Sequence, residues 1–124
     1  MSESVLVVDD DDDIREILRS LLSRQGFRVI TAADGGEALE RLQAGERPGL
    51  ILLDLMMPHV SGEEFRARQL AEPELAQIPV IVLSGAGAIQ EFAGKMSVEV
   101  IPKPIELSLL MSTVRRFCSP GSRP

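Results

Sequence analysis

The fold is decided by the stretch Leu50-Ile51-Leu52-Leu53-Asp54-Leu55-Met56-Met57-Pro58. Its first four residues are apolar and predict a strand that is buried on both faces of a parallel sheet. The strand runs into Asp54, and Pro58 stops any regular continuation. Open α/β sheets bind their ligands at the carboxyl ends of the strands, where Asp54 would lie. A lone aspartate at a strand end can equally cap a turn, so the interpretation depends on which other polar residues reach the same edge.

The composition narrows the class of protein. The chain has 124 residues, enough for one domain with a sizeable core. Its formal net charge of −6 argues against a nucleic-acid-binding protein, which normally carries a basic face. No apolar run reaches the length of a membrane span, and the acidic, polar start lacks the pattern of a secretory signal peptide. The single cysteine, Cys118, excludes an internal disulfide. We therefore expect a cytoplasmic protein without membrane insertion or direct nucleic-acid binding.

Short apolar runs alternate with segments of helical spacing along the chain. Strands are expected at residues 5–8, 27–31, 49–53, 79–83 and 98–101. Helices are expected at residues 14–22, around 38–42, at 63–71, around 89–94 and at 107–117. Alternation of this kind predicts a parallel sheet that is covered by helices on both faces and joined by right-handed crossovers. The sequence thus predicts a single α/β domain.

Two of the helices carry more specific expectations. The first has its apolar residues at helical spacing and should end at Gly26. These apolar residues are Ile14, Ile17, Leu18, Leu21 and Leu22. Acidic residues 9–13 precede it, and one of the last three should cap its N-terminus. The third helix has a weak apolar face, on which only Phe65 and Leu70 are expected to be buried.

Polar residues stand at the ends of four predicted strands. Asp9 and Asp10 follow the first strand, Asp54 the third, Ser84 the fourth and Lys103 the fifth. Because the carboxyl ends of parallel strands share one edge, three carboxylates would repel one another there unless a cation intervenes. A small number of hard oxygen ligands suits Mg²⁺. A lysine and a hydroxyl at this edge can hold a phosphoryl group, and a carboxylate beside Mg²⁺ can attack its phosphorus.

In this order and spacing, these residues form the motifs of a known family. The motifs are Val-Val-Asp-Asp after the first strand, Leu-Leu-Asp-Leu-Met-Met-Pro followed by Gly62, Ser-Gly after the fourth strand, and Lys-Pro after the fifth. From Val5 to about Phe117, the chain resembles the receiver domain of bacterial two-component response regulators. The resemblance implies a five-stranded, doubly wound, flavodoxin-like sheet with strand order 2-1-3-4-5. It implies a receiver domain at residues 1–118, with residues 119–124 as a flexible tail or the start of a linker.

The resemblance also implies roles for the acidic residues. Asp54 would accept a phosphoryl group from the phosphohistidine of a partner. Asp10 and Asp54 would bind Mg²⁺ together with the backbone carbonyl of Met56, and Asp9 would help through water. The chain would then not be a conventional enzyme, although it would catalyse its own phosphorylation. Met56 and Ala86 stand at positions that influence how water reaches the acyl phosphate, and neither can orient a water, so autodephosphorylation should be slow.

Other implied roles concern the phosphoryl group and the partners. Ser84 would donate a hydrogen bond to the phosphoryl group, and Lys103 would pair with it. The bond between Lys103 and Pro104 resembles the cis peptide of the family, which aims the lysine. The implied partners are a sensor histidine kinase or a histidine phosphotransferase, and a downstream protein of unknown identity. A weak dimer through the fourth helix, the fifth strand and the last helix is a further expectation.

The sequence departs from the family at Val100 and in the segment after Ser84. The family usually carries an aromatic residue three positions before the lysine, where its ring moves inward on phosphorylation, but this chain has Val100. The segment between Ser84 and Lys103 is also a few residues short. These departures keep an alternative open, a pseudo-receiver that binds proteins independently of phosphorylation. A flavodoxin-like nucleotide-binding protein is excluded because the first loop of this chain is acidic and would repel a phosphate. A haloacid-type phosphatase is excluded because a second aspartate is missing two residues after Asp54.

Overall fold

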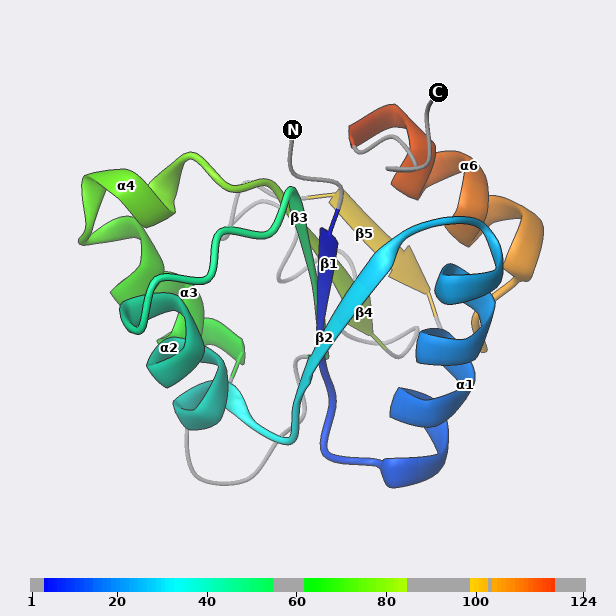
Figure 1. The fold of residues 1–124 in the computed structure, drawn as a ribbon, viewed down its shortest axis with the longest axis horizontal. Helices are drawn as coiled ribbons and strands as arrows, with labels where there is room; N and C mark the ends of the chain where they lie inside the picture. The colour runs from blue at the N-terminus through cyan, green and yellow to red at the C-terminus, as the bar shows by residue number, and fades with distance from the viewer. Residues whose placement is uncertain (1–3, 55–61, 85–98, 103, 118–124) are drawn as a thin grey trace.

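The computed structural model describes residues 4–54, 62–84, 99–102 and 104–117. Its strands form one parallel sheet in the order β2-β1-β3-β4-β5 (Figure 1). The strands are β1 (Ser4–Val8), β2 (Arg28–Ala32), β3 (Leu50–Asp54), β4 (Val80–Ser84) and β5 (Glu99–Pro102). The predicted fold class and strand order are therefore confirmed. Each strand from β2 to β5 begins and ends one residue later than predicted.

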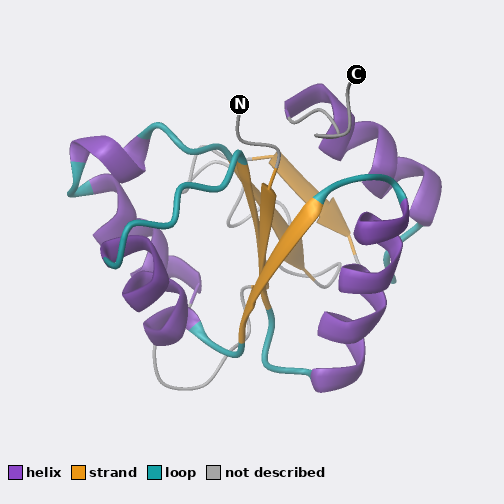
Figure 2. Ribbon diagram, in the orientation of Figure 1, coloured by secondary structure: helices purple, strands orange, loops and turns teal. Residues whose placement is uncertain are grey.

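Helices cover both faces of this sheet (Figure 2). The helices of the described residues are α1 (Asp12–Arg24), α2 (Gly35–Gln43), α3 (Gly62–Leu70), α4 (Pro73–Ala76) and α6 (Leu107–Phe117). Helices α1 and α6 lie on one face of the sheet, and α2, α3 and α4 lie on the other (Figure 1). The short α4 was not predicted, and the helix predicted around residues 89–94 lies outside the described residues. Among the described residues, no helix combines the length and the apolar character that a membrane span requires.

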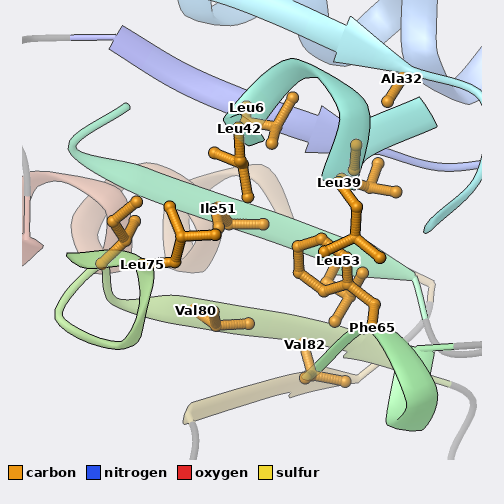
Figure 3. Close-up of a cluster of buried hydrophobic side chains, with 13 residues drawn as sticks. Leu6, Ala32, Leu39, Leu42, Ile51, Leu53, Phe65, Leu75, Val80 and Val82 are labelled. Carbon is orange, nitrogen blue, oxygen red and sulfur yellow. The ribbon is translucent and has the colours of Figure 1, made fainter. Parts of the chain in front are cut away.

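Alternation along the central strands divides the core into two layers. In β3, Leu50 and Leu52 point to the side of α1 and α6, whereas Ile51 and Leu53 point to the side of α2, α3 and α4. Successive residues of a strand point to opposite faces, so a strand with helices on both sides must be apolar at every position. Figure 3 shows the second layer, in which Phe65 packs with Leu53. The continuous apolar run that precedes Asp54 is thus explained by burial on both faces.

The N-terminal end of α1 is capped as the acidic run predicts. The side chain of Asp11 accepts hydrogen bonds from the backbone N–H groups of Asp13 (2.9 Å) and Ile14 (3.2 Å). Gly26 follows the other end with φ +96°, a conformation that suits glycine after a helix. The predicted apolar face is wider than the observed one, because Leu18 is buried while Ile17 is 53% exposed. The centre of the apolar stripe faces the sheet, and Ile17 lies at the margin of this stripe.

The prediction for the apolar face of α3 was half wrong. Phe65 is fully buried, but Leu70 is 49% exposed, and its neighbour Gln69 is buried instead. The amide of Gln69 donates hydrogen bonds to the carbonyl oxygens of Leu75 (2.7 Å) and Ile78 (3.0 Å). A buried amide is tolerated when its hydrogen bonds are satisfied, and these two bonds tie α4 and the segment that leads into β4 to α3. Apolar pattern alone could not reveal a polar side chain in this place.

We expect Gln69→Leu to lower the free energy of unfolding by about 2 kcal/mol, because the carbonyl oxygens of Leu75 and Ile78 would each lose a buried hydrogen-bond donor. Urea denaturation measures this loss. The control is Arg68→Ala, which removes an exposed ion pair with Glu64 and should cost less than about 0.5 kcal/mol. Equal losses in the two variants would contradict a role for Gln69 in holding α4.

Candidate functional site

The acidic residues of the first loop meet the end of β3 at the carboxyl edge of the sheet. Asp9 directly follows β1 and Asp54 is the last residue of β3, and these neighbouring strands are in register, with Val8 opposite Leu53. Carboxylate oxygens of Asp9, Asp10 and Asp54 all lie within 4.8 Å of one another. The structure thus brings together the three acids that the sequence placed at one edge. We call these three residues the acidic cluster.

The members of the acidic cluster differ in burial. Asp9 is 1% exposed and Asp54 is 3% exposed, whereas Asp10 is exposed to solvent. Buried carboxylates that are close to one another are costly unless opposite charge or hydrogen bonds compensate them. The cluster is therefore open to solvent on the side of Asp10 and closed by the sheet on the side of Asp9 and Asp54. This arrangement suits a ligand that enters from solvent and is held by the protein from one side.

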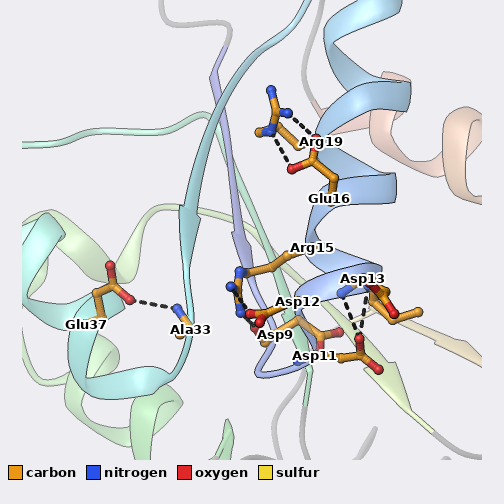
Figure 4. A network of polar contacts seen from close by, with 10 residues as sticks. Asp9, Asp11, Asp12, Asp13, Arg15, Glu16, Arg19, Ala33 and Glu37 are labelled. Atoms are coloured by element: carbon orange, nitrogen blue, oxygen red, sulfur yellow. Dashed lines mark hydrogen bonds and ion pairs between the residues drawn. The ribbon is translucent and has the colours of Figure 1, made fainter.

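Asp9 is held by hydrogen bonds from several directions. Its backbone N–H donates to the carbonyl oxygen of Ala32 at 3.1 Å, which continues the pairing of β1 with β2. Its carboxylate oxygen Oδ1 accepts from the backbone N–H of Asp11 at 2.9 Å, and its backbone carbonyl accepts from Nη1 of Arg15 at 2.8 Å. Figure 4 shows Arg15 reaching back from α1 to this turn, where it also pairs with Asp12. Arg15 was not among the site residues predicted from the sequence.

The remaining predicted site residues are described only in part. Ser84 ends β4 beside the end of β3, so its backbone lies at the edge that carries Asp54, but its side chain is outside the described residues. Lys103 and Met56 also lie outside the described residues, as does the bond between Lys103 and Pro104. The roles predicted for these side chains therefore remain predictions.

Three further predicted residues lie in described parts of the chain. Gly62 begins α3. Val100 lies opposite Val82 in the pairing of β4 with β5, is partly buried, and packs against the core layer on the α2 and α3 side. Pro104 is exposed and lines a groove of about 340 Å³ together with Ile17 and other residues of α1 and the segment that leads into α6.

The donor set of the acidic cluster fits a small hard cation. Three carboxylates supply oxygen atoms only, with no nitrogen or sulfur donor among them. Mg²⁺ prefers oxygen ligands, keeps several waters and needs few protein ligands, and it would relieve the repulsion between the carboxylates. A parallel sheet with such a cluster at the ends of β1 and β3 defines a doubly wound α/β protein with its site at the carboxyl edge.

Comparison with known proteins identifies the family. The model of the response regulator receiver domain matches residues 5–115, so the chain belongs to this family. Response regulator MprA of Mycobacterium ulcerans is 39% identical over 118 residues, which cover 93% of this chain and 50% of that protein. The chain thus spans about half the length of the curated relatives that it matches. The predicted resemblance is confirmed.

Solved structures agree with this assignment. A response regulator receiver protein from Pseudomonas putida superposes with a TM-score of 0.85 at 31% identity, over 94% of this chain and 98% of the other. TrrA, a response regulator protein from Thermotoga maritima, superposes with a TM-score of 0.82 at 28% identity, over 94% of this chain and 99% of the other. The TrrA structure was determined in complex with Mg²⁺ and BeF.

Proposed function

We propose that this chain is a phosphoacceptor receiver of a two-component system, in which Asp54 takes a phosphoryl group from a partner phosphohistidine. The observation that carries the proposal is the acidic cluster, in which the buried Asp54 lies within 4.8 Å of Asp9 and Asp10 at the open edge of the sheet. A carboxylate oxygen of Asp54 would form a bond to phosphorus while the bond from phosphorus to the histidine nitrogen breaks. The electron pair of that bond leaves with the imidazole.

The same residues would hold the cation that this transfer requires. Asp10, Asp54 and the backbone carbonyl of Met56 would bind Mg²⁺ directly, and Asp9 would bind it through water. A cation held by these residues would supply positive charge that offsets the negative charge of the phosphoryl oxygens. Asp9 would contribute a second effect of its own, because the hydrogen bonds of its N–H, Oδ1 and carbonyl oxygen fix the turn that presents Asp10.

The other proposed contacts act on the phosphoryl group and on proteins. Ser84 would donate a hydrogen bond to a phosphoryl oxygen, and Lys103 would pair with its negative charge. The phosphorylated domain, residues 1–118, would then change its affinity for a downstream protein in the cytoplasm, with residues 119–124 as tail or linker. The phosphodonor would be a sensor histidine kinase or a histidine phosphotransferase. A weak dimer through β5, α6 and the segment between β4 and β5 belongs to the same proposal.

The test of this function is the intact mass of the protein after incubation with acetyl phosphate. In this reaction Asp54 would replace acetate on phosphorus, and the acyl phosphate should add the mass of one phosphoryl group. The gain should require Mg²⁺ and should disappear in EDTA. If the mass does not rise either with Mg²⁺ or in EDTA, the proposal is contradicted.

Val100 favours a second candidate function, the pseudo-receiver. Its short, β-branched side chain has few rotamers and packs in a core layer, so it cannot swing as an aromatic ring does. We expect beryllofluoride, a mimic of the phosphoryl group, to shift amide NMR signals broadly across residues 85–100 while the methyl signals of Val100 move little. Such broad shifts would support a receiver in which the effect of phosphorylation passes through the backbone of this glycine-containing segment. Changes confined to the loops at the acidic cluster would favour the pseudo-receiver.

A further inference from the structure

The cationic side chain of Arg15 contacts the turn between β1 and α1. Arg15 is the fourth residue of α1, and helical side chains point back toward the N-terminus of their helix. From there Nη1 donates to the backbone carbonyl of Asp9 at 2.8 Å, and Nη2 pairs with the exposed carboxylate of Asp12. The side chain is only 21% exposed, so it is held against the turn and does not extend into solvent.

We propose that Arg15 is a positioning residue for the acidic cluster, which it serves by fixing the peptide group between Asp9 and Asp10. This inference rests on the proposed function, because it assumes that the cluster binds a divalent cation. The carbonyl of Asp9 and the N–H of Asp10 belong to one planar peptide. A donor that fixes this carbonyl therefore also fixes the N–Cα bond of Asp10, from which the Asp10 side chain projects.

The contact of Arg15 complements those that Asp9 makes with other elements. The N–H of Asp9 is bonded to β2 through Ala32, and its carboxylate is bonded to the start of α1 through Asp11. These bonds hold the buried Asp9, whereas the exposed Asp10 follows it in the turn. Arg15 acts on the link between the two residues, and so it would keep the oxygens of Asp10 close to those of Asp54 in the absence of a cation.

Charge and position predict opposite effects of removing Arg15. The guanidinium is positive and repels a cation, so by charge alone Arg15→Met should strengthen Mg²⁺ binding. If Arg15 instead holds Asp10 in place, the same variant should weaken binding, because the cation must then also order the turn. The sign of the change in dissociation constant therefore separates the two roles.

The experiment is a Mg²⁺ titration of the full chain, followed by amide NMR shifts or by calorimetry. We expect Arg15→Met to weaken Mg²⁺ binding by about tenfold, at the low end of effects measured for groups that orient metal ligands. Arg15→Lys keeps the positive charge and a group that donates hydrogen bonds, and it should restore part of the affinity. The matched control is Arg19→Met, one turn further along α1, where Arg19 pairs with Glu16 at the surface. It should change the dissociation constant by no more than about twofold, because its charge is screened by solvent.

A second readout separates positioning from loss of folding. Acetyl phosphate labelling of Arg15→Met should need more Mg²⁺, but its rate at saturating Mg²⁺ should return close to that of the original protein. If Arg15→Met does not fold, the comparison of Arg15→Lys with Arg19→Lys replaces it, with weaker binding expected only for the first.

Equal or tighter Mg²⁺ binding by Arg15→Met would overturn the inference, and so would equal losses in the Arg15 and Arg19 variants. Either result leaves the proposed function intact if the original protein binds Mg²⁺. Failure of the original protein to bind Mg²⁺ would instead overturn the proposed cation site, and the inference about Arg15 with it. The original protein is therefore titrated first.

Discussion

Asp54→Asn is expected to abolish the gain of one phosphoryl mass on incubation with acetyl phosphate and Mg²⁺. The amide of asparagine cannot act as the nucleophile, and the variant has almost the same size and shape as the original side chain. Asp54 is buried at the end of β3 beside Asp9 and Asp10, so we expect its labelling to account for the entire mass gain. Intact-mass spectrometry measures the loss, and circular dichroism checks that the fold is kept.

Asp34→Asn is the matched control for this experiment. Asp34 caps the N-terminus of α2 by accepting a hydrogen bond from the backbone N–H of Glu37 at 2.8 Å, and asparagine caps helices equally well. The control makes the same chemical change outside the acidic cluster and should be labelled normally. Labelling that persists in Asp54→Asn would show that another residue is the acceptor.

Mg²⁺ is expected to raise the melting temperature of the protein through the acidic cluster. A ligand that binds only the folded state stabilises it by about 2.7 kcal/mol at 100 times its dissociation constant. For a domain of this size, that corresponds to a rise of roughly 10 °C. The rise should depend on the cluster because Asp9, Asp10 and Asp54 come within 4.8 Å of one another only when β1 and β3 are paired. Thermal unfolding with and without Mg²⁺ measures the effect.

Asp10→Asn should change this response in two opposite ways. It removes one of three charges that repel one another, so the metal-free protein should melt at a higher temperature. It also replaces a charged carboxylate ligand by a neutral amide that binds Mg²⁺ more weakly, so most of the rise on adding Mg²⁺ should be lost. The control is Asp13→Asn, which makes the same charge change in the first turn of α1 and should leave the response to Mg²⁺ unchanged. If millimolar Mg²⁺ does not change the melting temperature of the original protein, the proposed cation site at the acidic cluster is contradicted.

Much of the candidate site could be predicted because it follows from the direction of the strands. Asp9 and Asp54 stand at the ends of apolar runs, and parallel strands bring such ends to one edge of the sheet. Arg15 could not be predicted in this way. Its contact with the carbonyl of Asp9 depends on the path of the turn between β1 and α1, which the residue pattern does not specify. An arginine one turn after a predicted cap was the only signal available.

The sequence by itself determined the order of the elements and the faces that they bury. Strand and helix periods are local properties of the chain, and so the run before Asp54 already required burial on both faces. The tertiary structure decided which side chains the neighbouring elements cover. Ile17 and Leu70 are apolar but exposed, whereas Gln69 is polar but buried, because α4 and the segment that leads into β4 supply the carbonyl oxygens that its amide needs. These partners are six and nine residues away along the chain, and only folding brings them to Gln69.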